Sequence, residues 1–413
     1  MFLKKQHIRL LIFCSLMLSI LTTSGCRQKR TIDVPGHLEG ATAAKDLDMR
    51  VLVAEMRSFE VNFDGSFQAV GADGHIQTFV KRPVPVKIES GTYGISINNV
   101  SFGQSAVLSR PGGKYLEING NRYRGTLNLF LAPDGQIRVV NVLPLEYYLA
   151  GVVAAEMPAS WEIEALKAQA VAARTYSLYV KFSAGDGRQW DVKSTQANQV
   201  YKGVEAENAR IWDVIEQTQG IVLASRDSDV RFNIIPAYFS STCGGVTVDA
   251  ELIFDLKMAP LCGVQCPYCK KTAPLKYYSW PEVVISKAEL YKKLCERYTN
   301  LKALGSLKGI KASEYVESGN FYKFLKVELT GENGKTDWLR GDDLRFIIGP
   351  SLVRSTACRI DDKGANVRFY NGRGYGHNVG MCQYGVQGMA REGRSYREIL
   401  KFYYPGVEIK GLY

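Results

Sequence analysis

The chain has 413 residues, of which 46% are hydrophobic and 23% are charged, which is the composition of a globular protein. This composition excludes a disordered, collagen-like or multi-span membrane protein, and the length predicts two or three folded regions. The net charge of +11 suits nucleic acid, an anionic membrane surface or an acidic polymer. The basic residues are scattered, so charge alone selects none of these partners and is equally consistent with simple solubility.

The N-terminus has the pattern of a secretory signal. Lys4, Lys5 and Arg9 give a positive start, and residues 10–21 form an apolar run that is too short to span a bilayer comfortably. Residues 1–25 are therefore predicted to be a signal peptide, and the mature protein is expected to be exported to the cell envelope.

Small residues then lead to a cysteine. The segment Thr23-Ser24-Gly25-Cys26 resembles a bacterial lipobox, although Thr23 stands where leucine is usual. This pattern predicts that Cys26 is lipidated and anchors the protein to a membrane, with residues 26–50 as a tether. The alternative is an ordinary signal peptide and a secreted or periplasmic protein.

Residues 51–140 are expected to form a β-rich N-terminal region. Short runs of Val, Ile, Phe and Tyr alternate there with hairpin-type turn signals. These turn signals are Asp64-Gly65, Asp73-Gly74, Asn119-Gly120 and Asp134-Gly135. No titratable cluster stands out, so the region is interpreted as a scaffold or a carbohydrate-gripping accessory region.

Helix signals begin at Pro144, where proline suits a first helical turn, and apolar residues at helical spacing then lead to Glu156. Pro158 disfavours helix at the preceding residue, so the helix should end near Glu156. A second, alanine-rich helix is expected to begin after Ser160, which is a good N-cap, and to end at about Lys181.

Further along the chain the pattern is mixed. Strands are predicted at residues 221–223, 234–240, 321–329 and 366–370, a polar helix within 280–299 and a final helix around 396–403. The fold class is therefore α+β: a mixed β-rich scaffold with a helical catalytic core, residues 141–413, that carries a cysteine-rich insertion around 243–270.

Glu156 is a candidate catalytic acid. A carboxyl group at a helix C-terminus lies near the negative end of the helix dipole, which raises its pKa, as do apolar neighbours such as Val152, Val153 and Met157. A glutamic acid that stays protonated near neutral pH can protonate a glycosidic oxygen. The alternative is a helix-ending glutamate that pairs with a neighbouring Lys or Arg.

Lys167 and Arg174 are candidate substrate ligands. They are seven residues apart, which places them on one face of the second helix. That face could hold the acetamido or carboxylate groups of a glycan.

Several ordered segments resemble the SpoIID/LytB family. They are LEYYLAGVVAAEMP (145–158), EALKAQAVAARTY (164–176), AYFSSTCGG (237–245), GRGYGHNVGMCQYG (372–385) and YYPG (403–406). The resemblance covers roughly residues 110–410 and is weaker in the middle.

The resemblance implies a peptidoglycan lytic transglycosylase with an elongated glycan-binding cleft. In such enzymes one glutamate, here Glu156, protonates the bond between N-acetylmuramic acid and N-acetylglucosamine, and the muramic C6 hydroxyl closes a 1,6-anhydro ring. Ordinary glycosidases need two carboxylates, whereas this intramolecular reaction needs one and no cofactor. The resemblance also places Lys167 and Arg174 at positions tied to catalysis and strand binding.

The glycine-rich segment at 372–385 lets the backbone approach a ligand closely, and it is not a P-loop. Asn378 and Cys382 depart from the family's usual Gly and Ser, and Asn tolerates a positive φ. His377 could contact the glycan or act as a partner for Glu156; the alternative is a purely structural role. The proposed sugar-contacting residues of this segment are Tyr375, His377, Gln383 and Tyr384.

Four cysteines cluster in the sequence: Cys243, Cys262, Cys266 and Cys269. The last three have spacing close to that of a zinc ribbon, and Cys243 would be the fourth thiolate of a structural zinc site. Because export favours oxidation, two disulfides are the alternative. The cysteines left without clear partners, as buried thiols, are Cys295, Cys358 and Cys382.

Three functions are compatible with these features. The first is the lytic transglycosylase, and the second is a non-catalytic peptidoglycan-binding activator of a cell-wall amidase. The third, a basic nucleic-acid or polyanion binder, is disfavoured because Lys and Arg do not cluster with aromatic residues. An acid at Glu156 favours the enzyme over the activator.

Overall fold

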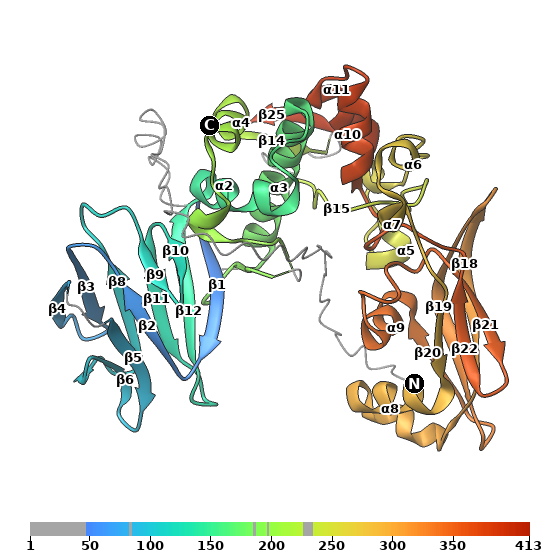
Figure 1. The fold of residues 1–413 in the computed structure, drawn as a ribbon, viewed down its shortest axis with the longest axis horizontal. Helices are drawn as coiled ribbons and strands as arrows, with labels where there is room; N and C mark the ends of the chain where they lie inside the picture. Colours follow the sequence, from blue (N-terminus) through green and yellow to red (C-terminus); the bar gives the residue numbers. More distant parts are fainter. Residues whose placement is uncertain (1–46, 82–84, 185–186, 196–197, 226–233) are drawn as a thin grey trace, which may run out of the picture. The chain divides into compact units, whose positions relative to one another are not determined.

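Figure 1 shows the computed structural model, which describes residues 47–81, 85–184, 187–195, 198–225 and 234–413. The predicted signal peptide, Cys26 and nearly all of the predicted tether lie outside these residues. The chain divides into two compact units. The N-terminal unit comprises the described residues up to 224 together with 234–236 and 409–413, and the C-terminal unit comprises 237–408.

Two sheets form the first part of the N-terminal unit. Within the described residues, one sheet has the order β13 (Val192–Lys193), β1 (Asp48–Met56), β12 (Ile137–Pro144), β11 (Thr126–Leu131), β8 (Ser105–Ser109), β3 (Ser66–Gly71) and β4 (Ile76–Val80). The other has the order β10 (Asn121–Tyr123), β9 (Leu116–Ile118), β2 (Ser58–Asn62), β5 (Val86–Gly91), β6 (Gly94–Ile97) and β7 (Val100–Ser101).

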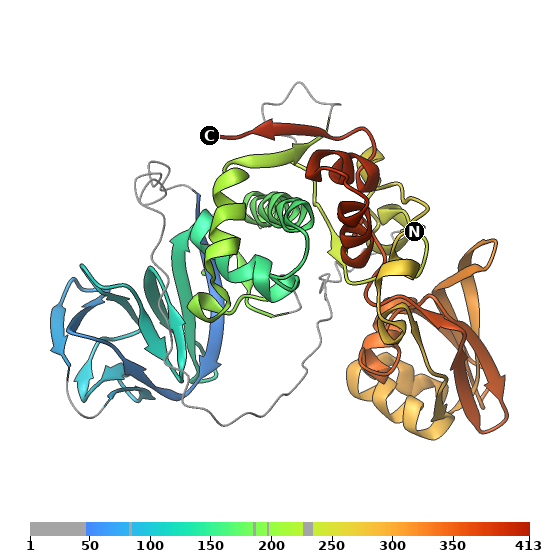
Figure 2. The ribbon, with the colours of Figure 1, turned by 45° about the horizontal axis from the view of Figure 1, so that its top comes forward.

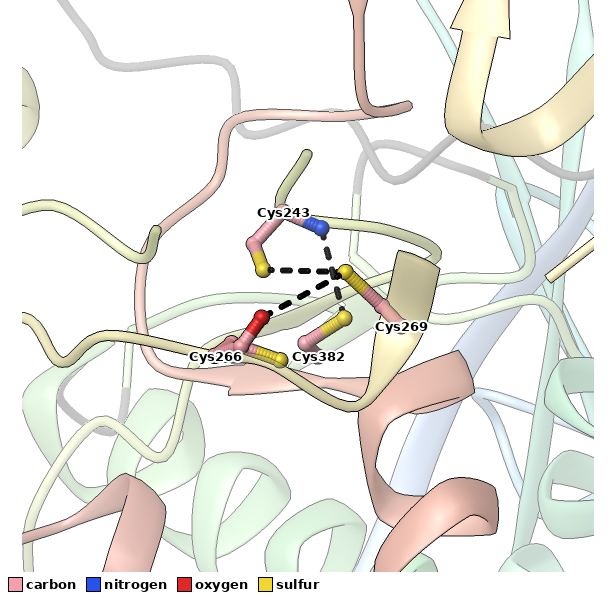
Figure 3. Close-up of side chains that lie close together, drawn as sticks. All are labelled: Cys243, Cys266, Cys269 and Cys382. Atoms are coloured by element: carbon pink, nitrogen blue, oxygen red, sulfur yellow. Dashed lines mark hydrogen bonds between the residues drawn. The ribbon is translucent and has the colours of Figure 1, made fainter. Parts of the chain in front are cut away.

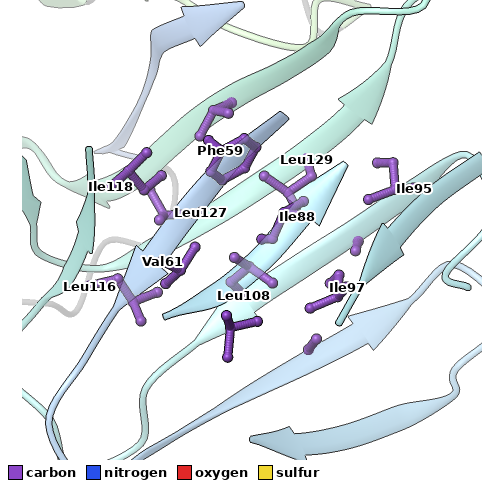
Figure 4. Packing of buried hydrophobic residues seen from close by; sticks show 14 of the residues in the cluster. Phe59, Val61, Ile88, Ile95, Ile97, Leu108, Leu116, Ile118, Leu127 and Leu129 are labelled. Atoms are coloured by element: carbon purple, nitrogen blue, oxygen red, sulfur yellow. The ribbon is translucent and has the colours of Figure 1, made fainter. Parts of the chain in front are cut away.

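A single apolar cluster joins these two sheets. Strands such as β2 alternate exposed and buried residues, so that one face of each strand carries the apolar side chains. Figure 4 shows side chains from both sheets meeting in this cluster, among them Phe59, Val61, Leu127 and Leu129. The predicted β-rich region is therefore a two-sheet structure held by an apolar core.

All four predicted turn glycines, at positions 65, 74, 120 and 135, have positive φ, as such turns require. Three of the four turns join paired strands: β3 to β4, β9 to β10 and β11 to β12. The prediction of a hairpin at Asp64-Gly65 is wrong, because β2 and β3 belong to different sheets and this turn passes between them.

Among its described residues, the N-terminal unit also has three α-helices, which pack against one another: α2 (Leu145–Glu156), α3 (Ile163–Ala184) and α4 (Ala209–Gln217) (Figure 2). Five alanines of α3 are fully buried, which confirms the expected close packing of its alanine-rich stretch. At Gly151 of α2, a Cβ atom would lie 2.5 Å from the ring of Tyr201, so only glycine fits there. The second helix begins at Ile163, and Ser160 is not its N-cap.

Strand β14 (Ile221–Ala224) confirms the predicted strand at 221–223, and it pairs with β25 (Glu408–Gly411) near the C-terminus. Figure 2 shows the two strands side by side. The predicted strand at 234–240 is shorter in the structure, where only β15 (Phe239–Ser240) and an isolated bridge between Ala224 and Ile234 form.

The C-terminal unit contains two three-stranded sheets in its described residues. One has the order β18 (Leu307–Ser318), β19 (Phe321–Gly331) and β20 (Thr336–Arg340), and the other β17 (Val283–Ser286), β22 (Asn366–Tyr370) and β21 (Arg359–Lys363). They share an apolar core with α8 (Lys287–Arg297) and α9 (Gly341–Ile348). These elements confirm the strands predicted at 321–329 and 366–370 and the polar helix.

Short elements form the rest of the C-terminal unit. Strand β15 pairs in parallel with β24 (Met381–Cys382), and β16 (Ser279–Trp280) pairs with β23 (Gly372–Arg373). The helices here are α5 (Ala250–Phe254), α6 (Cys269–Thr272), α7 (Leu275–Tyr278), α10 (Gln383–Arg391) and α11 (Tyr396–Tyr403). Helix α11 matches the predicted final helix and begins with a capping box at Ser395.

The predicted α+β class is confirmed, because both units combine sheets with helices. Among the described residues, no helix has the length and apolar character needed to cross a membrane.

Candidate functional site

Glu156 is the last residue of α2, as the sequence predicts. Met157 has an extended backbone, with φ −131° and ψ 143°, because Pro158 disfavours a helical conformation at the preceding residue. The Glu156 side chain is buried, and its Oε1 accepts the backbone N–H of Val200 at 2.8 Å. The apolar residues expected beside it, Val152, Val153 and Met157, are buried as well.

Gln199 and Tyr201 fix the backbone that carries the Val200 donor. The Gln199 side chain, fully buried, donates from Nε2 to the Ala173 carbonyl of α3 at 3.2 Å and accepts the Tyr148 hydroxyl of α2 at 3.3 Å. Tyr201 donates its hydroxyl to Asn141 Oδ1 at 2.8 Å. No sequence signal indicated these residues, because their role depends on a loop that returns to α2 and α3.

Arg174 is fully buried and forms a two-point ion pair with Glu146, in the first turn of α2. Its Nε and Nη2 atoms donate to the two carboxylate oxygens of Glu146 at 2.8 and 2.7 Å. Nη1 also donates to the Ile221 carbonyl at 3.2 Å. Direct contact between Arg174 and a glycan would require an exposed guanidinium, which this structure does not present, so the geometry makes Arg174 a residue that positions α2 on α3.

Lys167 differs from Arg174 in its surroundings. Its ammonium group lies 2.8 Å from Glu164 one turn earlier on α3, and its side chain keeps 15% of its surface exposed. The two cations expected to form one glycan-binding face therefore divide into a buried and a partly exposed group. A substrate contact by Lys167 stays a prediction.

His377 is held by the backbone of the C-terminal unit. Its Nδ1 accepts the Val379 N–H at 3.0 Å, so that the proton is on Nε2, which donates to the Phe239 carbonyl at 2.9 Å. Burial lowers the pKa of His377 to about 4, although Asp342 acts in the opposite direction. Because backbone groups occupy both ring nitrogens, the geometry favours the structural role over a glycan contact.

Asn378 adopts the left-handed conformation that the sequence analysis expected, with φ 63°. Its side-chain amide donates to the Thr242 carbonyl at 3.1 Å, and its Oδ1 accepts the Lys323 ammonium at 3.0 Å. Lys323 is fully buried, and burial lowers its pKa to about 8. Lys323 thus tethers the glycine-rich segment to β19, a role that no sequence signal indicated.

The remaining predicted sugar contacts are mostly inside the C-terminal unit. Tyr375 and Gln383 are buried, with 8% and 3% of their surface exposed. Tyr384 is half-buried beside the ring of Tyr277, and burial raises its pKa to about 12. Tyr384 is therefore the aromatic residue of the segment with the most accessible ring, and its sugar contact stays a prediction.

A candidate metal centre also lies in the C-terminal unit, and its members differ from the prediction. The buried residues Cys243, Cys266, Cys269 and Cys382 place their Sγ atoms within 4.8 Å of one another (Figure 3). Cys262 is not among them: it is exposed, and its thiol contacts the Gly263 carbonyl at 3.7 Å. The expectation that Cys262 belongs to the set and that Cys382 stands apart is wrong, because the parallel pairing of β15 and β24 brings Cys382 beside Cys243.

The pKa values of three thiols in this cluster are shifted from the ordinary cysteine value. Burial raises the pKa of Cys243 and of Cys382. The pKa of Cys266 is lowered, first by its hydrogen bond with Cys243.

The chain is similar in sequence to a known protein family. Residues 133–224 match the family model described as stage II sporulation protein. The chain is 34% identical to stage II sporulation protein D of Bacillus subtilis over 284 residues, which cover 65% of this chain and 75% of that protein. The chain belongs to the SpoIID/LytB family.

Two other relatives match a larger share of this chain. An uncharacterized protein of Brachyspira hyodysenteriae is 31% identical over 87% of this chain and 92% of its own length. The amidase enhancer of Bacillus subtilis is 29% identical over 78% of this chain, which corresponds to half of that longer protein. The span matched by the SpoIID model contains Glu156, Lys167 and Arg174, whereas the four clustered cysteines lie outside it.

Proposed function

We propose that the protein is exported to the cell envelope and cleaves peptidoglycan glycan strands as a lytic transglycosylase, with Glu156 as the single acid and base. The family is linked to the cell wall. The observation that carries the proposal is the placement of Glu156, a buried carboxyl at the end of α2 whose Oε1 is fixed by the Val200 N–H. A fixed, buried carboxyl suits proton transfer because its orientation is set before substrate arrives.

The proposed reaction needs no second carboxylate. Glu156 donates its proton to the glycosidic oxygen as the bond to C1 of N-acetylmuramic acid breaks. The C6 hydroxyl of the same sugar bonds to C1 and returns its proton to Glu156, so the acid is regenerated and no water is consumed.

The test uses glycan strands from which the stem peptides have been removed. We expect the full chain to release 1,6-anhydromuramic products, detected by mass spectrometry. Glu156→Gln, which keeps the shape of the side chain, should lower their rate of formation about 10²–10⁴-fold, the usual contribution of a general acid. Glu60→Gln, at an exposed position of β2 in the same unit, is the control and should leave the rate unchanged.

The alternative function is a non-catalytic, peptidoglycan-binding activator of a cell-wall amidase, and similarity to the amidase enhancer favours it. In that case the wild type forms no anhydro product, and wild type and Glu156→Gln accelerate peptide release by an added amidase equally. Equal product from wild type and Glu156→Gln would likewise contradict the proposed role of Glu156.

The proposal includes two features outside the described residues: a cleaved signal peptide and a lipid anchor at Cys26. An anchored enzyme would act on glycan strands close to the membrane surface. Cleavage of the signal peptide removes Lys4, Lys5 and Arg9 and lowers the net charge from +11 to +8, which would still favour an anionic polymer.

A further inference from the structure

Four thiols from three separate segments converge inside the C-terminal unit (Figure 3). Cys243 follows β15. Cys269 is the first residue of α6, and Cys266 lies three residues before it. Cys382 is the last residue of β24 and the N-cap of α10. All four are buried. Single buried thiols are common, but four sulfurs that meet at one point from three segments form the ligand set of a tetrahedral metal site.

The distances between the sulfurs suit a shared ion better than disulfides. Cys243 Sγ and Cys269 Sγ are 3.6 Å apart, whereas a disulfide requires about 2.05 Å. A tetrahedral zinc ion with Zn–S bonds of about 2.3 Å holds its sulfurs about 3.8 Å apart. All four Sγ atoms lie within 4.8 Å of one another, so small side-chain adjustments would complete such a tetrahedron.

Hydrogen-bond donors surround the sulfurs as they do around metal-bound thiolates. The Cys243 N–H donates to Cys382 Sγ at 3.3 Å. The Tyr403 hydroxyl lies 3.1 Å from Cys266 Sγ. Both contacts place a donor where it would stabilise negative charge on sulfur.

The backbone leaves room for these contacts only because α10 carries glycine. At Gly385, a Cβ atom would lie 2.8 Å from Cys266 Sγ and still closer to the Tyr403 hydroxyl. At Gly388, it would lie 2.9 Å from Tyr268, next to Cys269. Helices α6 and α10 therefore pack closely enough for their cysteines to share one ion.

We propose that Cys243, Cys266, Cys269 and Cys382 bind one structural zinc ion, with Cys382 rather than Cys262 as the fourth ligand. Binding converts the four thiols to thiolates, and the protons that they carry pass to solvent. Four protein sulfurs leave no open coordination position for water or substrate, so the ion has no catalytic role. Its role is to fix β24 and the glycine-rich segment against β15 and α6.

The experiment measures zinc in the full chain, purified without added metal, by plasma mass spectrometry, together with the thiols that react before and after chelation. We expect one zinc per chain and four thiols that become reactive only when zinc is removed. Cobalt exchanged into the site should give the intense visible absorption of a tetrahedral thiolate complex. This test needs no glycan, so its outcome is separate from that of the proposed enzymatic function.

Matched serine variants decide which cysteines bind. Cys382→Ser should lower zinc affinity at least tenfold and weaken the sulfur-to-cobalt charge-transfer band. Cys262→Ser and Cys358→Ser, at an exposed and a buried cysteine outside the cluster, should keep one zinc with unchanged affinity.

Two results would overturn the proposal. One is wild-type protein without zinc whose clustered cysteines are linked in disulfides or do not bind added zinc. The other is loss of zinc in Cys262→Ser with retention in Cys382→Ser. If Cys382→Ser fails to fold, the number of cobalt–thiolate bonds in the wild type, counted from its charge-transfer intensity, still decides between three and four sulfur ligands.

Discussion

The two ends of α2 each carry a buried glutamate, and the two carboxyl groups have different surroundings. Glu146, in the first turn, accepts two hydrogen bonds from Arg174, one from the Tyr413 hydroxyl and one from the Gly220 N–H at 3.4 Å. Glu156, in the last turn, accepts the Val200 N–H through Oε1. Burial is similar at the two ends, with 6% and 4% exposed, so burial does not distinguish a structural from a catalytic carboxyl.

The difference lies in the donors. Glu146 has a full counter-charge and joins α2, α3 and the C-terminal residue Tyr413, which is what an anchor of the fold requires. Glu156 is oriented by a backbone amide on a loop that Gln199 and Tyr201 hold in place. A backbone amide fixes the orientation of a carboxyl group before substrate arrives, which suits the proton transfer proposed for Glu156.

Glu146→Gln is expected to have the largest effect on stability. It leaves the Arg174 charge buried without its carboxylate, so the free energy of unfolding of the N-terminal unit should fall by about 3–5 kcal/mol. Glu156→Gln, which keeps a carbonyl acceptor for the Val200 N–H, should cost less than about 1.5 kcal/mol. Because the chain has two units, unfolding is measured by hydrogen exchange of the α2 and α3 amides as denaturant is added.

Replacement of both partners is the control for this effect. Glu146→Leu combined with Arg174→Met should restore much of the lost stability, because apolar side chains of similar volume can replace a buried ion pair. Equal losses for Glu146→Gln and Glu156→Gln would remove the distinction between the two ends of α2.

Local sequence patterns predicted the elements around Glu156 well. Helix α2 depends on Pro144, a helical apolar stripe and Pro158, which are signals that act within a few residues. The sequence also predicted the positive φ of Asn378 from the tolerance of its side chain for that conformation. Such features follow from local backbone energetics and do not need the tertiary structure.

The parts that could not be predicted depend on contacts between distant segments. Spacing suggested Cys262 as the fourth member of the cysteine cluster, whereas Cys382, 139 residues after Cys243, takes its place in the cluster through strand pairing. Helical periodicity placed Arg174 beside Lys167 but gave no sign of Glu146, 28 residues earlier, as its partner. Lys323, on β19, likewise lies 55 residues before its partner Asn378, so local patterns gave no sign of their contact.

His377 is buried in the C-terminal unit, whereas His75 lies at the surface of the N-terminal unit. Since burial holds the pKa of His377 at about 4, below its ordinary value of 6.5, the unfolded chain binds a proton at mildly acidic pH that the folded chain does not. The stabilising contribution is complete above pH 6.5 and declines as the pH falls towards 4. Between pH 7 and 5.5 the loss should be about 1 kcal/mol.

Histidine hydrogen exchange, followed by mass spectrometry of the folded wild type, checks this titration directly. The exchange midpoint of the peptide with His377 should lie well below the ordinary histidine pKa of 6.5. His377→Gln should also show a smaller change of stability between pH 7 and 5.5 than wild type or His75→Gln. A midpoint for His377 near pH 6.5 would mean that both backbone hydrogen bonds break readily.

The smallest effect on stability is expected for Lys167→Ala. This variant tests whether Lys167, the partly exposed cation of α3, contacts substrate. The ion pair of Lys167 with Glu164 is partly exposed and lies on one helix, so its loss should lower the free energy of unfolding by less than about 1 kcal/mol. If Lys167 contacts the muramic carboxylate, the same variant should weaken binding of peptide-free glycan strands about tenfold or more, the equivalent of a lost charge-assisted hydrogen bond.

Lys181→Ala, later on α3, is the matched control, because Lys181 binds the Asp48 carbonyl at 3.0 Å and should affect stability rather than glycan affinity. Unchanged glycan affinity in Lys167→Ala would leave α3 as a structural helix whose two cations both serve the fold.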